Sequence, residues 1–163
     1  MIPIVSVVGY SNSGKTTFLV KLIRELKSRG YRVATVKHHH RDFEIDIPGK
    51  DTWRHAEAGA DTVVLASPGK VAVVERTPRE LTLDEIAAKI SGVDIIITEG
   101  FKQENKPKVE VFRSDVHSKL ISPPDQLLAV VSDIVFEGLP TFGFSDMAGL
   151  ADIIIKTMLR PAN

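Results

Sequence analysis

The stretch that decides the fold spans residues 7–17 and reads Val-Val-Gly-Tyr-Ser-Asn-Ser-Gly-Lys-Thr-Thr. It follows a β-branched run at residues 4–8, which is typical of a strand buried on both faces. It precedes a helix pattern with an apolar stripe, formed by Phe18, Leu19, Leu22, Ile23 and Leu26. Residues 9–16 fit G-x-x-x-x-G-K-[ST] without a mismatch, in the strand–turn–helix context that this motif requires. The pattern predicts a phosphate-binding loop, and a chance match on a glycine-rich turn is the alternative.

Each fixed residue type in this loop has a physical reason. The glycines allow positive φ and leave room for an anion, while successive N–H groups and the helix N-terminus attract negative charge. Lys15 places an ammonium on the β- and γ-phosphates, the Thr16 hydroxyl can ligate Mg²⁺, and Thr17 can reach the α-phosphate. The predicted nucleotide-binding residues are therefore Gly9, Tyr10, Ser11, Asn12, Ser13, Gly14, Lys15, Thr16 and Thr17.

Size and composition indicate an ordinary soluble domain. The 163 residues, 43% hydrophobic and 26% charged, predict one domain over residues 1–163. The formal net charge of zero gives no indication of a nucleic-acid or membrane partner. The absence of cysteine excludes disulfides and thiolate metal sites. Because we see neither a signal peptide nor an apolar run of roughly 20 residues, we expect a cytoplasmic protein.

Strand and helix patterns alternate along the chain. We expect strands at residues 4–8, 31–38, 93–100, 107–114, 127–133 and 140–146, and helices at 15–29, 50–59, 81–91 and 147–159. Residues 61–76 resemble two strands joined by a Ser-Pro-Gly turn, which favours an antiparallel hairpin. The alternation predicts an α/β fold: a three-layer sandwich with a mostly parallel central sheet, as in P-loop NTPases, with an antiparallel hairpin.

A phosphate-binding loop needs an acid on a neighbouring strand to orient magnesium. Glu99 comes at the end of the mainly apolar strand expected at residues 93–100, and ligands bind beyond the carboxyl ends of parallel strands, so we expect Glu99 beside the loop. With Lys15 it forms the predicted catalytic pair. Asp51 and Asp46, in the polar segment after the second strand, are further candidate metal ligands, although Asp51 also suits a helix N-cap. The predicted magnesium ligands are Thr16, Asp51 and Glu99.

Two other features leave alternatives open. The run His38–His40, with His55 nearby, suggests a transition-metal site, but adjacent strand residues point to opposite faces and a contact with phosphate or a partner ligand is the simpler interpretation. The guanine-reading tetrad Asn-Lys-x-Asp is absent. Asp133, at the end of a buried-looking strand, could accept the guanine N1–H and N2–H, or simply be a turn residue. The residues alone therefore leave ATP and GTP open.

Three segments in order and spacing resemble a known family: VVGYSNSGKTT at 7–17, TVKHHHRDFEIDIPGKDTWRHAEAGA at 35–60, and DIIITEGFKQENKPKVEVFR at 94–113. The chain is similar to the molybdopterin-guanine dinucleotide biosynthesis protein B family over most of residues 4–113. The resemblance implies a homodimeric GTP-binding P-loop protein with weak GTPase activity. It also implies a role beside the guanylyltransferase that joins GMP to molybdopterin. Lys37, His38, Asp51 and residues 99–102 match family signature positions near the phosphate site.

Three functions remain in play. In the first, a GTP-bound dimer is an adaptor for cofactor-assembly enzymes and hydrolyses GTP slowly, because no catalytic base or arginine finger is obvious; Arg41 and Arg54 are candidates by location only. In the second, the same loop serves a small-molecule kinase or ligase whose acceptor lies near Lys37, Lys102 and Glu99. In the third, a metallochaperone-type GTPase delivers nickel through the histidines. The apolar hairpin at 61–76, if at a sheet edge, offers a surface that a second copy could cover.

Overall fold

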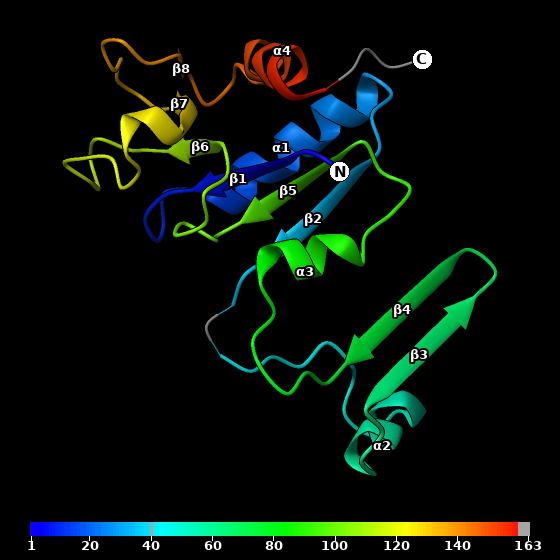
Figure 1. The fold of residues 1–163 in the computed structure, drawn as a ribbon. Coiled ribbons are helices and arrows are strands. Elements are labelled where there is room, and N and C mark those ends of the chain that lie inside the picture. The colour runs from blue at the N-terminus through cyan, green and yellow to red at the C-terminus, as the bar shows by residue number, and fades with distance from the viewer. Residues whose placement is uncertain (40, 160–163) are drawn as a thin grey trace. The chain divides into compact units, whose positions relative to one another are not determined.

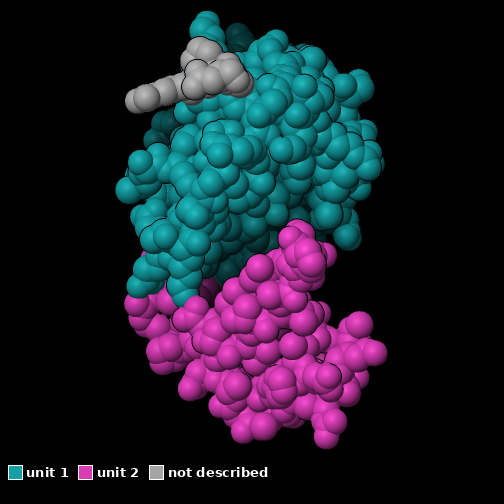
Figure 2. Space-filling view, turned by 90° about the vertical axis from the view of Figure 1, so that its right-hand side faces the viewer, with its two compact units in different colours: residues 1–38, 83–163 teal, residues 39–82 magenta. Residues whose placement is uncertain are grey.

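The computed structural model describes residues 1–39 and 41–159. Its elements in order are β1 (Ile4–Val8), α1 (Lys15–Ser28), β2 (Val33–Lys37), α2 (Asp51–Glu57), β3 (Thr62–Ser67), β4 (Lys70–Glu75), α3 (Leu83–Ala88), β5 (Ile95–Glu99), β6 (Lys108–Val111), η1 (Pro124–Gln126), β7 (Leu127–Val131), β8 (Thr141–Phe142) and α4 (Met147–Met158) (Figure 1). The chain divides into two compact units, one from Met1–His38 and the part from Leu83 on, the other from residues 39–82 (Figure 2). That residues 1–163 form a single domain stays a prediction.

The first unit contains a six-stranded sheet in the order β2-β5-β1-β6-β7-β8. Every neighbouring pair in it is parallel. β1 lies between β5 and β6, and all five of its residues are buried, as its continuous β-branched sequence predicts. The chain builds β2 and β5 on one side of β1 and β6 to β8 on the other. The carboxyl end of β1 is therefore the point where the strand order reverses, which is where parallel α/β sheets bind ligands.

Helices pack on both faces of this sheet, so the predicted α/β sandwich is confirmed (Figure 1). α1 and α4 share one core with the sheet, and the predicted α1 stripe forms it: Phe18, Leu19, Leu22 and Leu26 are buried, with Ile23 partly so. Leu83 of α3 packs with Ile4 and Ile96 on the other face. Within residues 1–39 and 41–159, no helix combines the length and apolarity needed to cross a bilayer.

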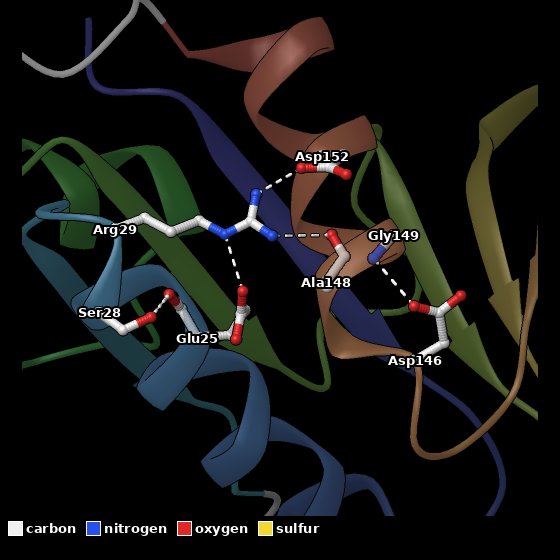
Figure 3. Close-up of polar contacts among 7 residues, drawn as sticks. All are labelled: Glu25, Ser28, Arg29, Asp146, Ala148, Gly149 and Asp152. Carbon is white, nitrogen blue, oxygen red and sulfur yellow. Dashed lines mark hydrogen bonds and ion pairs between the residues drawn. The ribbon is translucent and has the colours of Figure 1, made fainter.

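Polar contacts fix α1 against α4 (Figure 3). Arg29, at the end of α1, donates from Nε to Glu25 Oε1 at 2.8 Å and from its terminal nitrogens to Asp152 and the carbonyl of Ala148. These bonds raise the pKa of Arg29, first through Asp152 and then through Glu25. The helix that follows the loop of residues 9–14 is thus tied at its far end to a second helix.

The second unit contains α2 and the two-stranded sheet β3–β4. The pairing is antiparallel, from Thr62 opposite Glu75 to Ser67 opposite Lys70, which confirms the predicted hairpin. It forms a sheet of its own rather than an edge of the central sheet. Val64 and Leu65, successive residues that point to opposite faces, are both more than half exposed. Both faces of this hairpin therefore present apolar side chains.

Candidate functional site

The loop between β1 and α1 has the backbone shape that its glycines predict. Gly9 has φ +147° and Gly14, the residue that caps α1, has φ +88°. A Cβ on Gly9 would lie 2.5 Å from the carbonyl oxygen of Val111 on the neighbouring strand β6. Glycine is required at this position because the loop starts in direct contact with another strand's backbone.

Lys15, the first residue of α1, folds back across this loop. Its Nζ donates to the carbonyl oxygen of Tyr10 at 2.5 Å. Partial burial lowers the pKa of Lys15; the carboxylate of Glu99 opposes that shift, and the charge of Lys37 adds to it. The ammonium therefore lies over the loop, among charged groups of two further strands.

Glu99 is the last residue of β5 and lies beside the loop, as expected. The sheet register places it opposite Val7 of β1 and opposite Lys37 of β2. Its Oε1 accepts a hydrogen bond from Thr16 Oγ1 at 2.9 Å and lies 3.5 Å from Lys37 Nζ. Its side chain is only 13% exposed. Two oxygens that suit magnesium, a hydroxyl and a carboxylate, thus converge at the first turn of α1.

The residues after β5 and β2 adjoin this acid. The backbone N–H of His38 donates to the carbonyl of Glu99 at 3.0 Å, and the imidazole ring of His38 lies 4.8 Å from the ring of Phe101. Gly100 has φ +98°, and a Cβ there would lie 3.2 Å from Cβ of His38. Lys37 and His38 therefore lie next to Glu99, as their match to the family signature positions implies.

An arginine that sequence reasoning missed contacts the opposite side of the loop. Arg113, two residues after β6, donates from Nε to the carbonyl oxygen of Ser13 at 3.3 Å. Its guanidinium carbon lies 4.4 Å from the centre of the Phe144 ring. Nearby, the rings of Tyr10 and His117 stack with centroids 4.1 Å apart. Arg113 comes just after a buried strand, whereas Glu99 is the last residue of one, and only the strand order places Arg113 beside the loop.

Asp133 lies on the same side, after β7, and is exposed. Its carboxylate accepts from the Ser114 hydroxyl at 2.6 Å and from the Ser114 N–H at 3.0 Å. These bonds hold the pKa of Asp133 below its ordinary value. The residue therefore anchors the segment after β6, and its role in reading guanine stays a prediction.

The remaining candidate metal ligands, Asp46 and Asp51, belong to the second unit, as does His39. Asp51 is the first residue of α2, and Lys50 rather than Asp51 is the N-cap, so the alternative N-cap interpretation was wrong. Asp46 accepts from the N–H of Ile47. His39 Nδ1 lies 2.9 Å from the carbonyl of Arg41, while His40 lies outside the described residues. In the described ranges, no group of three or more His, Asp or Glu side chains is arranged to hold a metal.

Comparison with known proteins gives consistent matches. Residues 4–133 match the family model described as molybdopterin guanine dinucleotide synthesis protein B. A molybdopterin-guanine dinucleotide biosynthesis adapter protein of Haemophilus influenzae is 40% identical, over 83% of this chain and 78% of that protein. The protein of that name from Escherichia coli is 36% identical, over 98% of this chain and 95% of the relative.

Solved structures agree with the sequence matches. The crystal structure of Bacillus subtilis MobB superposes with a TM-score of 0.75 and 28% identity, over 99% of this chain and 100% of that one. A crystal structure of molybdopterin-guanine biosynthesis protein B gives a TM-score of 0.72 and 32% identity, over 94% of this chain and 98% of that one. On the family model, the relatives and the shared fold, the chain belongs to the molybdopterin guanine dinucleotide synthesis protein B family, MobB, whose curated members are adapter proteins of molybdopterin-guanine dinucleotide biosynthesis.

Proposed function

We propose that the protein binds Mg²⁺ and GTP at the loop of residues 9–17, hydrolyses GTP slowly, and serves as an adaptor in the formation of molybdopterin guanine dinucleotide. One observation carries the nucleotide part of this proposal. Thr16 and Glu99, 83 residues apart in the chain, meet at 2.9 Å beside the ammonium-bearing loop. A hydroxyl and an acid beside a P-loop lysine are the arrangement that binds nucleoside triphosphates with magnesium.

The residues at the loop fit both the Mg²⁺ ion and the triphosphate. Mg²⁺ prefers a few hard oxygen ligands and keeps several waters, and Thr16 and Glu99 supply two such oxygens. When bound, the ion would neutralise charge on the phosphates. The Ser13 hydroxyl is fully buried within the loop and has no hydrogen-bond partner among the described residues. A buried polar atom of this kind supports a polar ligand at the loop.

The chain's own residues divide the work of binding. The main-chain N–H groups of the loop and the start of α1 hold phosphate oxygens, and Lys15 exchanges its bond to the Tyr10 carbonyl for one to phosphate. Glu99 orients the hydroxyl of Thr16. We expect slow turnover because the two cations that interact with Glu99 here, Lys37 and Lys15, are lysines and not arginines. Arg113 contacts the loop through Ser13, from the β6 side of the sheet. A well-placed arginine is worth roughly 10³–10⁵ in rate.

The adaptor part comes from the family. The relatives are named adapter proteins of molybdopterin-guanine dinucleotide biosynthesis, which supports cofactor-assembly enzymes such as the guanylyltransferase, or molybdopterin itself, as partners here. We further propose a homodimer in the cytoplasm. The hairpin β3–β4 supports the dimer, because Val64, Leu65, Val71 and Val73 are each at least 55% exposed and a second copy would cover them.

The test is a comparison of nucleotides and acceptors. Calorimetric titration with Mg-GTP and Mg-ATP should show a guanine preference that falls in Asp133→Ala. Single-turnover hydrolysis should be slow and independent of added small-molecule acceptors. Phosphoryl transfer to an acceptor at many turnovers per second would instead establish the kinase or ligase alternative, and binding neither nucleotide would overturn the proposal. Retention of nickel at micromolar concentration would favour the metallochaperone.

A further inference from the structure

Strand order brings a cation to the side of the loop away from Glu99. β5, which ends in Glu99, pairs with one edge of β1, and β6 pairs with the other edge. Arg113 comes two residues after the last residue of β6. The loop of residues 9–14 therefore has Glu99 on one side and Arg113 on the other.

Arg113 contacts the loop at the residues that shape its last turn. Nε donates to the carbonyl oxygen of Ser13, and Nη2 lies 3.7 Å from where a Cβ on Gly14 would be. Gly14 begins the hydrogen-bonding of α1, since its carbonyl accepts from the N–H of Phe18 at 2.9 Å. The guanidinium thus fixes the peptide from which the helix N-terminus starts, and places a positive charge beside it.

The guanidinium is itself held in place. One side of it lies over the Phe144 ring at 4.4 Å, a cation–π distance. The segment that follows is fixed at both ends by carboxylates: Asp133 accepts from Ser114, and the fully buried Glu110 accepts from the N–H groups of Ile121 and Ser122 at 2.7 and 3.0 Å. The Phe144 ring and the fixed segment after Arg113 thus both restrict where its guanidinium can lie, so the guanidinium can hold the loop in one orientation.

We infer that Arg113 is the positioning residue of the phosphate-binding loop: it orients the Ser13–Gly14 peptide through its hydrogen bond and adds positive potential for the phosphates. This inference rests on the proposed nucleotide binding. Lysine cannot fully replace it, because a lysine ammonium lacks the planar fork that both stacks on Phe144 and donates to Ser13. The role differs from that of an arginine that reads the base, because the contact is with the main chain of the loop.

The experiment measures dissociation constants of the full chain for Mg-GTP and for Mg-tripolyphosphate, which has no base. The variants are Arg113→Ala, Arg113→Lys and, as a control that removes the same charge, Arg24→Ala. Arg24 is an exposed residue of α1, roughly 13 Å along the helix from Lys15. Thermal unfolding of each variant shows which of them are folded, and Arg113→Lys keeps the test valid if Arg113→Ala does not fold.

Loss of a hydrogen bond from a charged donor predicts affinity about tenfold weaker or more in Arg113→Ala, by the same factor for GTP and tripolyphosphate. Arg113→Lys should recover part of that loss, and Arg24→Ala should bind within twofold of the parent. If the parent binds both ligands and Arg113→Ala binds them equally well, the inference is overturned while the proposed function stands. A loss confined to GTP would also overturn it, in favour of a base contact. A parent that binds neither ligand would overturn the proposed function, and this inference with it.

Discussion

Gly9→Ala tests why the loop begins with glycine. The new Cβ would lie 2.5 Å from the carbonyl oxygen of Val111 and 2.9 Å from Oγ of Ser13. Both distances are below 3.0 Å, and Cβ atoms in proteins essentially never come that close to a non-bonded heavy atom. The Val111 carbonyl belongs to a fully buried strand, so it cannot move away freely.

The expected cost has two parts. Overpacking against a buried strand costs roughly 1–3 kcal/mol. Holding alanine at the φ of +147° found at Gly9 costs roughly 1–3 kcal/mol more. We therefore expect the free energy of unfolding to fall by roughly 2–6 kcal/mol, which for a chain of this size lowers Tm by roughly 4–24 °C.

Urea unfolding followed by circular dichroism measures this change, and titration with Mg-GTP at a temperature where the variant is folded measures the proposed nucleotide binding. Gly143→Ala is the matched control, because Gly143 has no positive φ and its Cβ would meet nothing within 4 Å. A Gly9→Ala protein as stable as the Gly143→Ala control, with unchanged nucleotide affinity, would refute the reasoning that the close approach to β6 requires glycine.

Two further predictions concern carboxylates. Glu99→Gln keeps an oxygen for the Thr16 hydroxyl but removes the charge beside Lys37, so we expect the magnesium concentration needed for half-maximal GTP binding to rise severalfold. Titration of Mg²⁺ at fixed GTP measures that concentration, and an unchanged midpoint would argue against Glu99 as a metal-site residue. Asp94 accepts three bonds from Arg32, which lower its pKa to about 2 from 3.8, so the stability it contributes is complete above pH 3.8 and disappears as the pH falls through about 2. Asp94→Asn should therefore lower Tm at pH 6 but not near pH 2, whereas Asp115→Asn, an exposed control, should change Tm at neither; a Tm difference that is the same at both pH values would contradict the ion-pair explanation.

Most of the fold follows from local pattern. The buried run at residues 4–8 and the α1 stripe each have one dominant cause in the sequence, and each lies where the pattern predicts it. The expected strand at 140–146 is shorter, because only Thr141 and Phe142 pair with β7 at the sheet edge. The position of Glu99 beside the loop was predictable because an acid that ends a parallel strand emerges at the edge of the sheet where such folds bind ligands.

The rest depends on which strand lies next to which. Arg113 carries no motif, and its approach to Ser13 exists only because β6 pairs with β1. The bonds from Ser114 to Asp133 likewise join the segments after two neighbouring strands. Periodicity shows which side chains are buried, but strand order is set by long-range packing. The contacts on the β6 side of the loop could therefore be identified only from the structure.

The most direct test of the central claim is the dissociation constant of Mg-GTP for the parent and for Lys15→Ala, with Lys21→Ala as the control. Lys21 is an exposed lysine of the same helix, so its loss changes the net charge equally. Charge-assisted hydrogen bonds of about 1.5–3 kcal/mol predict a loss of roughly 10- to 150-fold in Lys15→Ala, and almost none in Lys21→Ala. Equal affinity of the parent and Lys15→Ala would contradict the claim that this loop holds a nucleoside triphosphate.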